Sequence, residues 1–93
     1  MVVVYFSRPA EHDLKRLPHE AIEDLRAKHI PALADNTRIG KSLHGPLRGF
    51  FSYDFHSSGV SYRIAYELIK SDVVILMIGA RDNFYKKFTR RSR

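Results

Sequence analysis

The stretch VSYRIAYELIKSDVVILMI, residues 60 to 78, decides the fold. Its first half alternates large apolar residues with polar or small ones, which is the period of a strand with one buried face. Lys70, Ser71 and Asp72 then form a turn sequence. The VVILMI run that follows is apolar throughout and therefore predicts a central strand that is buried on both faces.

Further strands and two helices precede this hairpin. FFSYDFH at 50–56 alternates in the same way, and VVVYF at 2–6 is β-branched and aromatic. Between them, residues 7–17 and 18–34 have helical patterns. The predicted order is β-α-α-β-β-β. We expect an α+β fold in which a helical hairpin packs on a mainly antiparallel four-stranded sheet, with a short basic helix or tail at the C-terminus.

The two helices have recognisable boundaries. Ser7 can cap the first helix, whose first turn tolerates Pro9 and favours Glu11, and this helix is expected to end near Leu17. The second helix begins after Pro18, and Pro31 should kink or close it, although the PALA sequence allows one more turn.

Composition places the chain among globular proteins. Its 93 residues suit a single domain, 1–93, and 44% of them are hydrophobic. The sequence has no cysteine, so disulfide and thiolate chemistry are excluded, and no apolar run approaches the ~20 residues that a membrane-spanning helix needs. We expect a protein of the cytoplasm that has no membrane partner.

The positive charge is concentrated in the second half of the chain. Residues 1–35 carry five Lys/Arg and six Asp/Glu, whereas residues 36–93 carry eleven Lys/Arg and four Asp/Glu. Clustered positive charge creates a local potential that attracts polyanions, while a basic surface can also serve only for solubility. The asymmetry favours a polyanion partner for the C-terminal half.

One face of the predicted sheet is polar. The period-2 pattern places six side chains on the face opposite the core: Ser52, Asp54, His56, Ser61, Arg63 and Glu67. Arg81 and Tyr85 follow the last strand directly and can fold back over that face. Guanidinium groups pair with phosphate oxygens, and carboxylate, imidazole or phenol groups move protons. These residue types are therefore suited to cleavage of an RNA phosphodiester.

Each of these residues also has a plainer interpretation. Arg63 can pair with Glu67 or Asp54 across the sheet, Tyr85 can pack the tail onto the sheet, and His56 beside its turn can be a solvated residue. No pair of histidines or His/Cys set has the spacing of a metal site, and no phosphate-binding glycine loop is present. The sequence therefore predicts neither a metal nor another cofactor.

Three motifs in this order resemble the RelE/ParE superfamily of toxins from bacterial type II toxin–antitoxin modules. They are LHG at 43–45, SYRIAYEL at 61–68 and GARDNFYKK at 79–87, and the similarity covers nearly the whole chain. The resemblance implies a RelE-like toxin that cleaves mRNA in the ribosomal A site by 2′-OH attack and is neutralised by a cognate antitoxin. It also implies active-site roles for Arg63, Arg81 and Tyr85.

The sequence departs from RelE at one point. RelE has two lysines on its second strand, and the matching positions here are Ser52 and Asp54. Asp54 and His56 become candidate replacements, because other ribosome-dependent members use carboxylate or histidine groups. The departure leaves open a ParE-like function, in which the same fold inhibits DNA gyrase. For a nuclease, the expected contacts with rRNA and mRNA come from the basic residues Arg48, Lys86, Lys87, Arg90 and Arg91.

Overall fold

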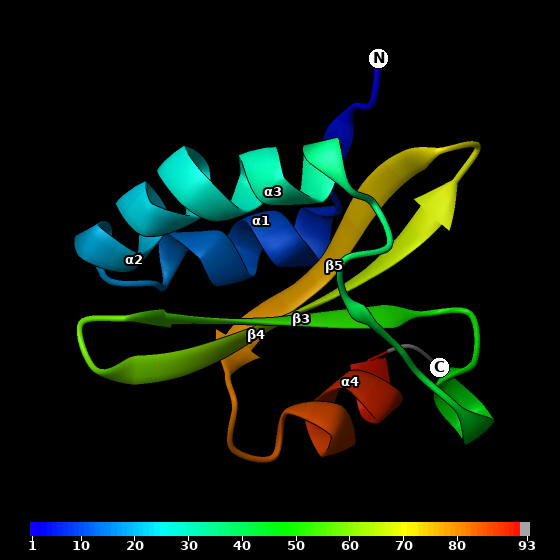
Figure 1. Ribbon diagram of the computed structural model, residues 1–93. Helices are drawn as coiled ribbons and strands as arrows, with labels where there is room; N and C mark the ends of the chain where they lie inside the picture. The colour runs from blue at the N-terminus through cyan, green and yellow to red at the C-terminus, as the bar shows by residue number, and fades with distance from the viewer. Residues whose placement is uncertain (92–93) are drawn as a thin grey trace.

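The computed structural model describes residues 1–91 of the chain. A five-stranded sheet carries a helical layer on one face and a single C-terminal helix on the other (Figure 1). The strands are β1 (Val4–Phe6), β2 (Lys41–Ser42), β3 (Phe51–Ser57), β4 (Val60–Ile69) and β5 (Asp72–Ala80). The helices are α1 (Arg8–Lys15), α2 (His19–Asp24), α3 (Ile30–Asp35) and α4 (Phe84–Arg91). A π-helical turn (Leu25–His29) joins α2 to α3, and a 3₁₀ turn spans Gly45–Leu47.

The strand order across the sheet is β1-β5-β4-β3-β2. β1 pairs with β5 in parallel, and the other neighbouring strands are antiparallel. The α+β class and the meander of the last three strands are confirmed. β5 is an inner strand, but β4 occupies the middle of the sheet, and β5 alternates buried and half-buried residues instead of being fully buried on both faces. The predicted count of four strands falls short by one. β2 has only two residues, which pair with the start of β3, and so short a strand gives no period-2 pattern in the sequence.

The first helix begins as predicted. The Ser7 hydroxyl accepts a hydrogen bond from the Ala10 backbone N–H at 3.2 Å, Pro9 lies in the first turn, and Glu11 follows it there. α1 ends at Lys15, two residues earlier than Leu17. Within residues 1–91 no helix is long and apolar enough to cross a bilayer.

The second helix does not close at Pro31 but continues through the PALA sequence, which was the alternative that the sequence allowed. α2, the π-helical turn and α3 follow one another without a break, and α3 extends to Asp35. A proline ring inside a helix clashes with the carbonyl four residues earlier, and its nitrogen donates no hydrogen bond. The wider π-helical turn lies just before this proline and gives the ring room, so the chain accommodates Pro31 with a local change of helix type.

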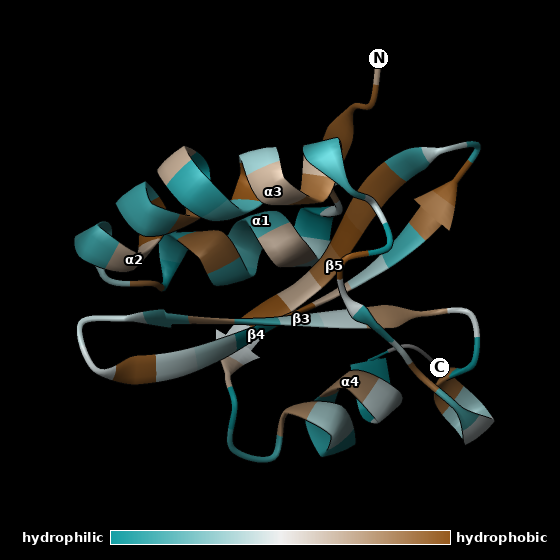
Figure 2. Cartoon of the chain, in the orientation of Figure 1, coloured by the Kyte–Doolittle hydropathy of each residue, from teal (hydrophilic) through white to brown (hydrophobic). Residues whose placement is uncertain are grey.

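The sheet has an apolar core on each face. Figure 2 colours hydrophobic residues brown, and β5 is brown along most of its length. The helical hairpin covers the larger core, which includes the fully buried Leu33, Ile64 and Ile75. α4 covers the smaller core with Phe84 and Phe88, which lie one turn apart on the same side of that helix.

The second core corrects the prediction of a wholly polar face. Ala65 and Met77 of this face are buried beneath α4, and Ser52 is only 4% exposed. Asp54 and His56, farther along β3, stay exposed. The face is therefore apolar under α4 and polar beyond it, because the two phenylalanines within a basic segment form a helix face that seals one part of the sheet.

Candidate functional site

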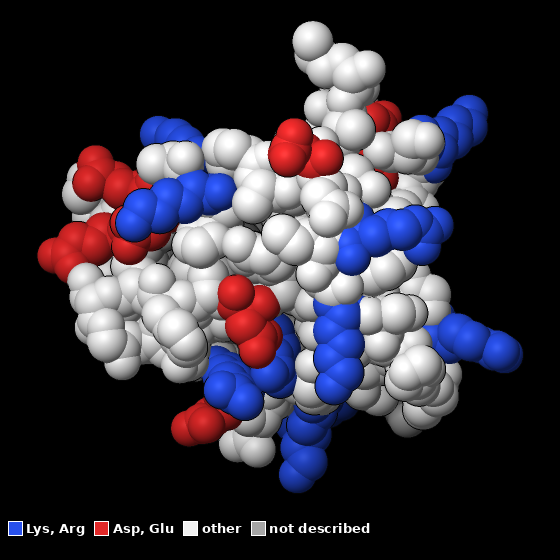
Figure 3. All heavy atoms as spheres, in the orientation of Figure 1, with Lys and Arg blue, Asp and Glu red and all other residues white. Residues whose placement is uncertain are grey.

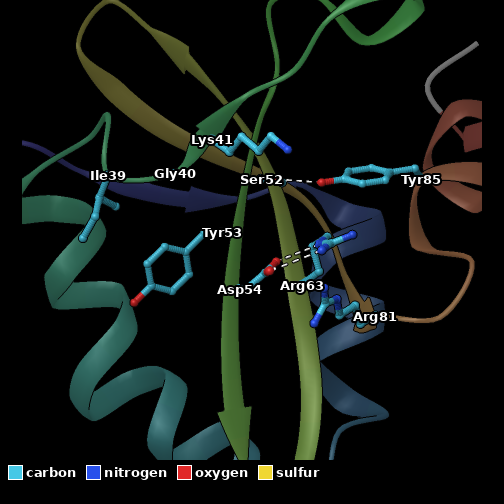
Figure 4. Close-up of a pocket in the computed structure, with 9 residues that line it drawn as sticks. All are labelled: Ile39, Gly40, Lys41, Ser52, Tyr53, Asp54, Arg63, Arg81 and Tyr85. Carbon is cyan, nitrogen blue, oxygen red and sulfur yellow. Dashed lines mark hydrogen bonds and ion pairs between the residues drawn. The ribbon is translucent and has the colours of Figure 1, made fainter.

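A hollow opens on the α4 side of the sheet, where β2, β3, β4 and the first turn of α4 meet. Its volume is about 410 Å³. The close-up in Figure 4 shows the nine residues that line it: Ile39, Gly40, Lys41, Ser52, Tyr53, Asp54, Arg63, Arg81 and Tyr85. Four of the five side chains predicted from sequence to be catalytic therefore border one space, although they come from four different segments of the chain.

Arg63 and Asp54 form a bidentate ion pair at this hollow. They lie directly opposite each other in the β3–β4 register. Arg63 Nε donates to Asp54 Oδ1 at 2.7 Å, and Arg63 Nη2 donates to Asp54 Oδ2 at 3.2 Å. The hydrogen bond from Arg63 is the main reason that the pKa of Asp54 is lowered, and the same bond raises the pKa of Arg63. The pair holds the guanidinium in a fixed orientation.

Tyr85 lies against this pair. The guanidinium carbon of Arg63 stands 4.5 Å from the centre of the Tyr85 ring, an arrangement in which the cation interacts with the ring face. The Tyr85 hydroxyl is 3.0 Å from the buried Ser52 Oγ. Burial of the neighbouring Phe84 and Phe88 fixes α4, so the second core places this phenol at the hollow.

Arg81 differs from Arg63 in being free of a fixed partner. Its backbone N–H donates to Ser61 O at 3.0 Å, and this bond continues the sheet past the end of β5. Its side chain makes no hydrogen bond or ion pair with any of residues 1–91, although its charge helps to lower the pKa of Asp54. Both arginines also line an adjoining hollow of about 650 Å³. Arg81 is thus the more available of the two for an anion.

His56 lies outside the lining of both hollows. Its Nδ1 is 3.0 Å from Ser61 Oγ across the β3–β4 hairpin, and its side chain is exposed. Asp54, two residues earlier on the same strand, is therefore the better placed of the two candidates to act beside Tyr85. Within residues 1–91, no three His, Asp or Glu side chains gather as they would around a metal ion.

Lys41 borders the hollow and was missed from the sequence. It pairs with Ser52 in the β2–β3 register, so it brings an ammonium group to the rim of the hollow beside Ser52. Gly40 makes this possible, since a Cβ there would lie 2.6 Å from both Ser52 O and the Tyr66 hydroxyl. The Gly40 N–H also donates to that hydroxyl at 3.0 Å. The only sequence signal at this lysine is GKS at 40–42, which lacks the preceding glycine that a phosphate-binding loop needs.

The predicted RNA-contacting residues fall into two groups. Arg48, Lys86, Lys87 and Arg90 are exposed, and no fixed partner holds their side chains within residues 1–91. Arg91 instead forms a bidentate ion pair with Asp13 of α1, with N···O distances of 2.7 and 3.1 Å. Figure 3 shows the charge asymmetry of this face, with acidic side chains gathered over α2 and Lys and Arg around the α4 side.

The fold is that of a class of small bacterial toxins. The family model described as the ParE-like toxin of type II bacterial toxin–antitoxin systems matches residues 4–89. The chain belongs to this family, and it is the toxin component of a type II toxin–antitoxin system. A comparison with curated protein sequences found no match.

Solved structures agree with this assignment. A chain of the RelBE2 toxin–antitoxin complex from Mycobacterium tuberculosis is 30% identical, with a TM-score of 0.75, and the alignment covers 86% of this chain and 98% of that one. The isolated RelE toxin of E. coli is 25% identical with a TM-score of 0.68, and both chains are covered completely. YafQ from E. coli shares the fold at 14% identity and a TM-score of 0.60, over 91% of this chain and 99% of that one.

Proposed function

We propose that this toxin is an endoribonuclease that cleaves mRNA in the ribosomal A site. The observation that carries the proposal is the convergence of Arg63, Arg81, Tyr85 and Asp54 on one hollow. Attack by a ribose 2′-OH needs a proton acceptor, positive charge for the phosphorane-like transition state, and a proton donor for the departing 5′ oxygen. All three kinds of group border this space.

The two arginines suit the phosphate. The free guanidinium of Arg81 can take a phosphate oxygen directly, whereas Arg63 must share or exchange its bonds to Asp54. Guanidinium groups bind phosphate through two parallel hydrogen bonds, and one well-aimed donor in a transition state contributes about 3–4 kcal/mol. Lys41 adds a third cation at the rim of the same hollow.

The Arg63–Asp54 pair also explains how a carboxylate with a lowered pKa can act as a base. While Arg63 donates to it, Asp54 is a weak proton acceptor. When a scissile phosphate takes over the Arg63 donors, the main cause of the lowering is removed and the pKa of Asp54 moves back toward its ordinary value. Substrate binding thereby strengthens the base.

The reaction then balances with the chain's own groups. The 2′ oxygen forms a bond to phosphorus as its proton passes to Asp54, and the bond from phosphorus to the 5′ oxygen breaks. The Tyr85 hydroxyl gives its proton to that oxygen, while the Arg63 charge beside the ring stabilises the phenolate that remains. The products are a 2′,3′-cyclic phosphate and a 5′-hydroxyl end.

The remaining partners follow from the charge distribution. The exposed Arg48, Lys86, Lys87 and Arg90 would contact rRNA and mRNA backbones, and such contacts release counterions from the nucleic acid. A cognate antitoxin would cover these cations with an acidic or amphipathic segment, or displace the C-terminal element. Two of the similar solved structures are toxin–antitoxin complexes. We place this activity in the cytoplasm, where translating ribosomes are found.

Inhibition of DNA gyrase is the second candidate function. The ParE-like description of the matching family favours it, as does the presence of Ser52 and Asp54 where RelE has lysines. In this alternative the Arg63–Asp54 pair would be a permanent structural link and the basic surface would contact protein or DNA.

Brief expression of the toxin in a bacterium separates the two functions. The nuclease predicts growth arrest and primer-extension stops within translated codons, both lost in the Arg81→Ala/Tyr85→Ala double variant. Glu67→Gln on the neighbouring strand is a matched control, since no bond within residues 1–91 holds its side chain at the hollow. Uncut messages together with inhibited supercoiling by the purified toxin would reject the nuclease in favour of the gyrase inhibitor.

A further inference from the structure

The short helix α4 depends on contacts with the rest of the domain to stay folded against the sheet. It has only eight residues, and five of those eight are Lys, Arg or Thr. Helices of this length are unstable in isolation, so α4 depends on its tertiary contacts. Phe84 in the first turn of α4 and Phe88 in its middle are buried in the second core. Its last turn carries a different contact.

That contact lies on the edge of β5 that faces β1, beyond the point where β1 ends; the opposite edge of β5 is paired with β4 throughout. β1 pairs with β5 only as far as Ile75, opposite Phe6, and the Ser7 N–H donates to Ile75 O at 2.9 Å. β5 itself continues to Ala80. Beyond β1, two side chains satisfy backbone groups of β5. Asp13 Oδ2 accepts from Ile78 N at 3.0 Å, and Arg91 Nη1 donates to Leu76 O at 3.2 Å.

The same two side chains bind each other. Arg91 Nη1 lies 2.7 Å from Asp13 Oδ2, and Nη2 lies 3.1 Å from Oδ1. Asp13 is 12% exposed and Arg91 is 34% exposed, so solvent screens this pair less than an open surface pair. Through these bonds α1, the bare edge of β5 and the end of α4 form one junction.

We propose that Asp13 and Arg91 form a clasp that holds α4 against the sheet, and that both are positioning residues for Tyr85. The proposal rests on the nuclease function above, because it assigns the clasp a role in that reaction. Tyr85 lies in the first turn of α4, and its hydroxyl reaches Ser52 only while the helix is docked. Opening the clasp frees the last turn and loosens the whole helix over the second core.

The clasp and an RNA contact make opposite predictions for Asp13. If Arg91 bound a phosphate, the nearby carboxylate would weaken that binding, and its removal would leave cleavage unchanged or raise it. In a clasp the two residues act together. Asp13→Asn and Arg91→Gln should then lower cleavage by similar factors. The asparagine keeps an oxygen to accept the Ile78 N–H, so this variant loses the ion pair but retains the cap on β5.

Cleavage of a defined mRNA in a reconstituted translation system measures the effect. We expect each variant to lower kcat roughly tenfold, since small displacements of a reacting group cost one to two orders of magnitude, with little change in KM for the programmed ribosome. In a Tyr85→Phe background neither variant should lower the remaining rate further, because the clasp acts through that hydroxyl. Losses that multiply in this background, or an Asp13→Asn variant as active as wild type, would overturn the proposal.

Matched controls test whether any lost charge has the same effect. Asp72→Asn removes a carboxylate that caps the other end of the sheet, by accepting from Val3 N at 3.0 Å, without touching α4. Arg8→Gln removes an exposed arginine from α1. Both should cleave like wild type. A tenfold loss in either control would assign the effect to general charge or sheet stability.

Hydrogen exchange tests the clasp independently of the nuclease. In Asp13→Asn and Arg91→Gln the amides of α4 should exchange faster than in wild type, while those of β3 and β4 keep their protection. If the wild-type toxin leaves mRNA intact, the proposed function fails and this measurement alone decides on the clasp. Unchanged exchange across α4 in both variants would overturn it.

Discussion

The two faces of the sheet are built on different scales. The hairpin face buries a core from α1, α2 and α3 against all the long strands, whereas the α4 face buries a small core beneath one eight-residue helix. The candidate site lies on the second face, beside the smaller core. We infer that the hairpin face contributes most of the stability of the domain. The α4 face positions the site precisely, but its helix can be released more easily.

Core truncations should separate the two faces most strongly. Leu33→Ala in the hairpin core should lower the free energy of unfolding by about 2–5 kcal/mol, because it leaves a cavity among fully buried side chains. Phe88→Ala should release α4 first, at a cost below the 3–5 kcal/mol typical of a phenylalanine in a single rigid core. Denaturant unfolding measures the first effect, and exchange of α4 amides measures the second.

The same two variants should rank in the opposite order when cleavage is measured instead of stability. At a temperature where both variants remain folded, Leu33→Ala should still cleave mRNA and Phe88→Ala should have lost cleavage along with the position of Tyr85. If Phe88→Ala unfolded the whole domain and Leu33→Ala left it intact, the proposed division between the faces would be wrong.

Within the α4 face, Arg63→Ala should have the next largest effect. Losing a donor to the charge that develops on the phosphate costs about 10²-fold in cleavage. The Asp54 side chain is 46% exposed, so water can solvate the carboxylate that Arg63→Ala leaves unpaired, and the melting temperature should fall only modestly. Single-turnover cleavage and circular dichroism test this prediction together. A large drop in melting temperature with unchanged cleavage would make Arg63 a structural residue.

The smallest expected effects are changes of folding stability with pH. They should differ between a group on the α4 face and a group on the hairpin face. The pKa of Asp54 is lowered by the Arg63 hydrogen bond, so its contribution is present above the ordinary carboxyl range and is lost as pH falls below about 4. The pKa of His29 is lowered mainly by burial under the hairpin. Its unfolded form therefore binds more protons, and stability should begin to fall as pH drops through about 6.5.

Melting curves from pH 8 to pH 3 distinguish these groups. The difference between wild type and Asp54→Asn should be constant near neutral pH and narrow below pH 4. His29→Gln, which removes the hydrogen bond to the Tyr53 hydroxyl at 2.8 Å, should instead flatten the slope between pH 7 and pH 5. A wild-type slope in that interval after His29→Gln would show that another group titrates there.

The sequence predicted the hairpin face better than the α4 face. The alternation in β3 and β4 and the apolar run of β5 are local signals, so these three strands could be placed from the sequence. Their register, which includes a shift between Ala65 and Tyr66, was not predicted. Phe84 and Phe88 carry no such signal within a basic segment, and their burial appears only when α4 folds back on the sheet. The polar face was therefore predicted to be larger than it is.

The residues of the candidate site could likewise be predicted only where the sequence carries a local motif or alternation. Arg63, Arg81 and Tyr85 were found through motifs that the family shares, and the cross-strand pairing with Asp54 followed from strand alternation as one of two choices. Lys41 could not be found this way. Its place depends on a two-residue strand and on a close approach at Gly40, both of which are set by distant parts of the chain.

The most direct test of the central claim is the chemistry of the RNA ends left by the purified toxin in a reconstituted translation system. The account predicts cuts within the A-site codon that carry a 2′,3′-cyclic phosphate on one fragment and a 5′-hydroxyl on the other. These ends should be absent without ribosomes and absent with the folded Arg81→Ala/Tyr85→Ala variant. Intact message with the wild-type toxin, or the same cuts with the double variant, would contradict the assignment of this site.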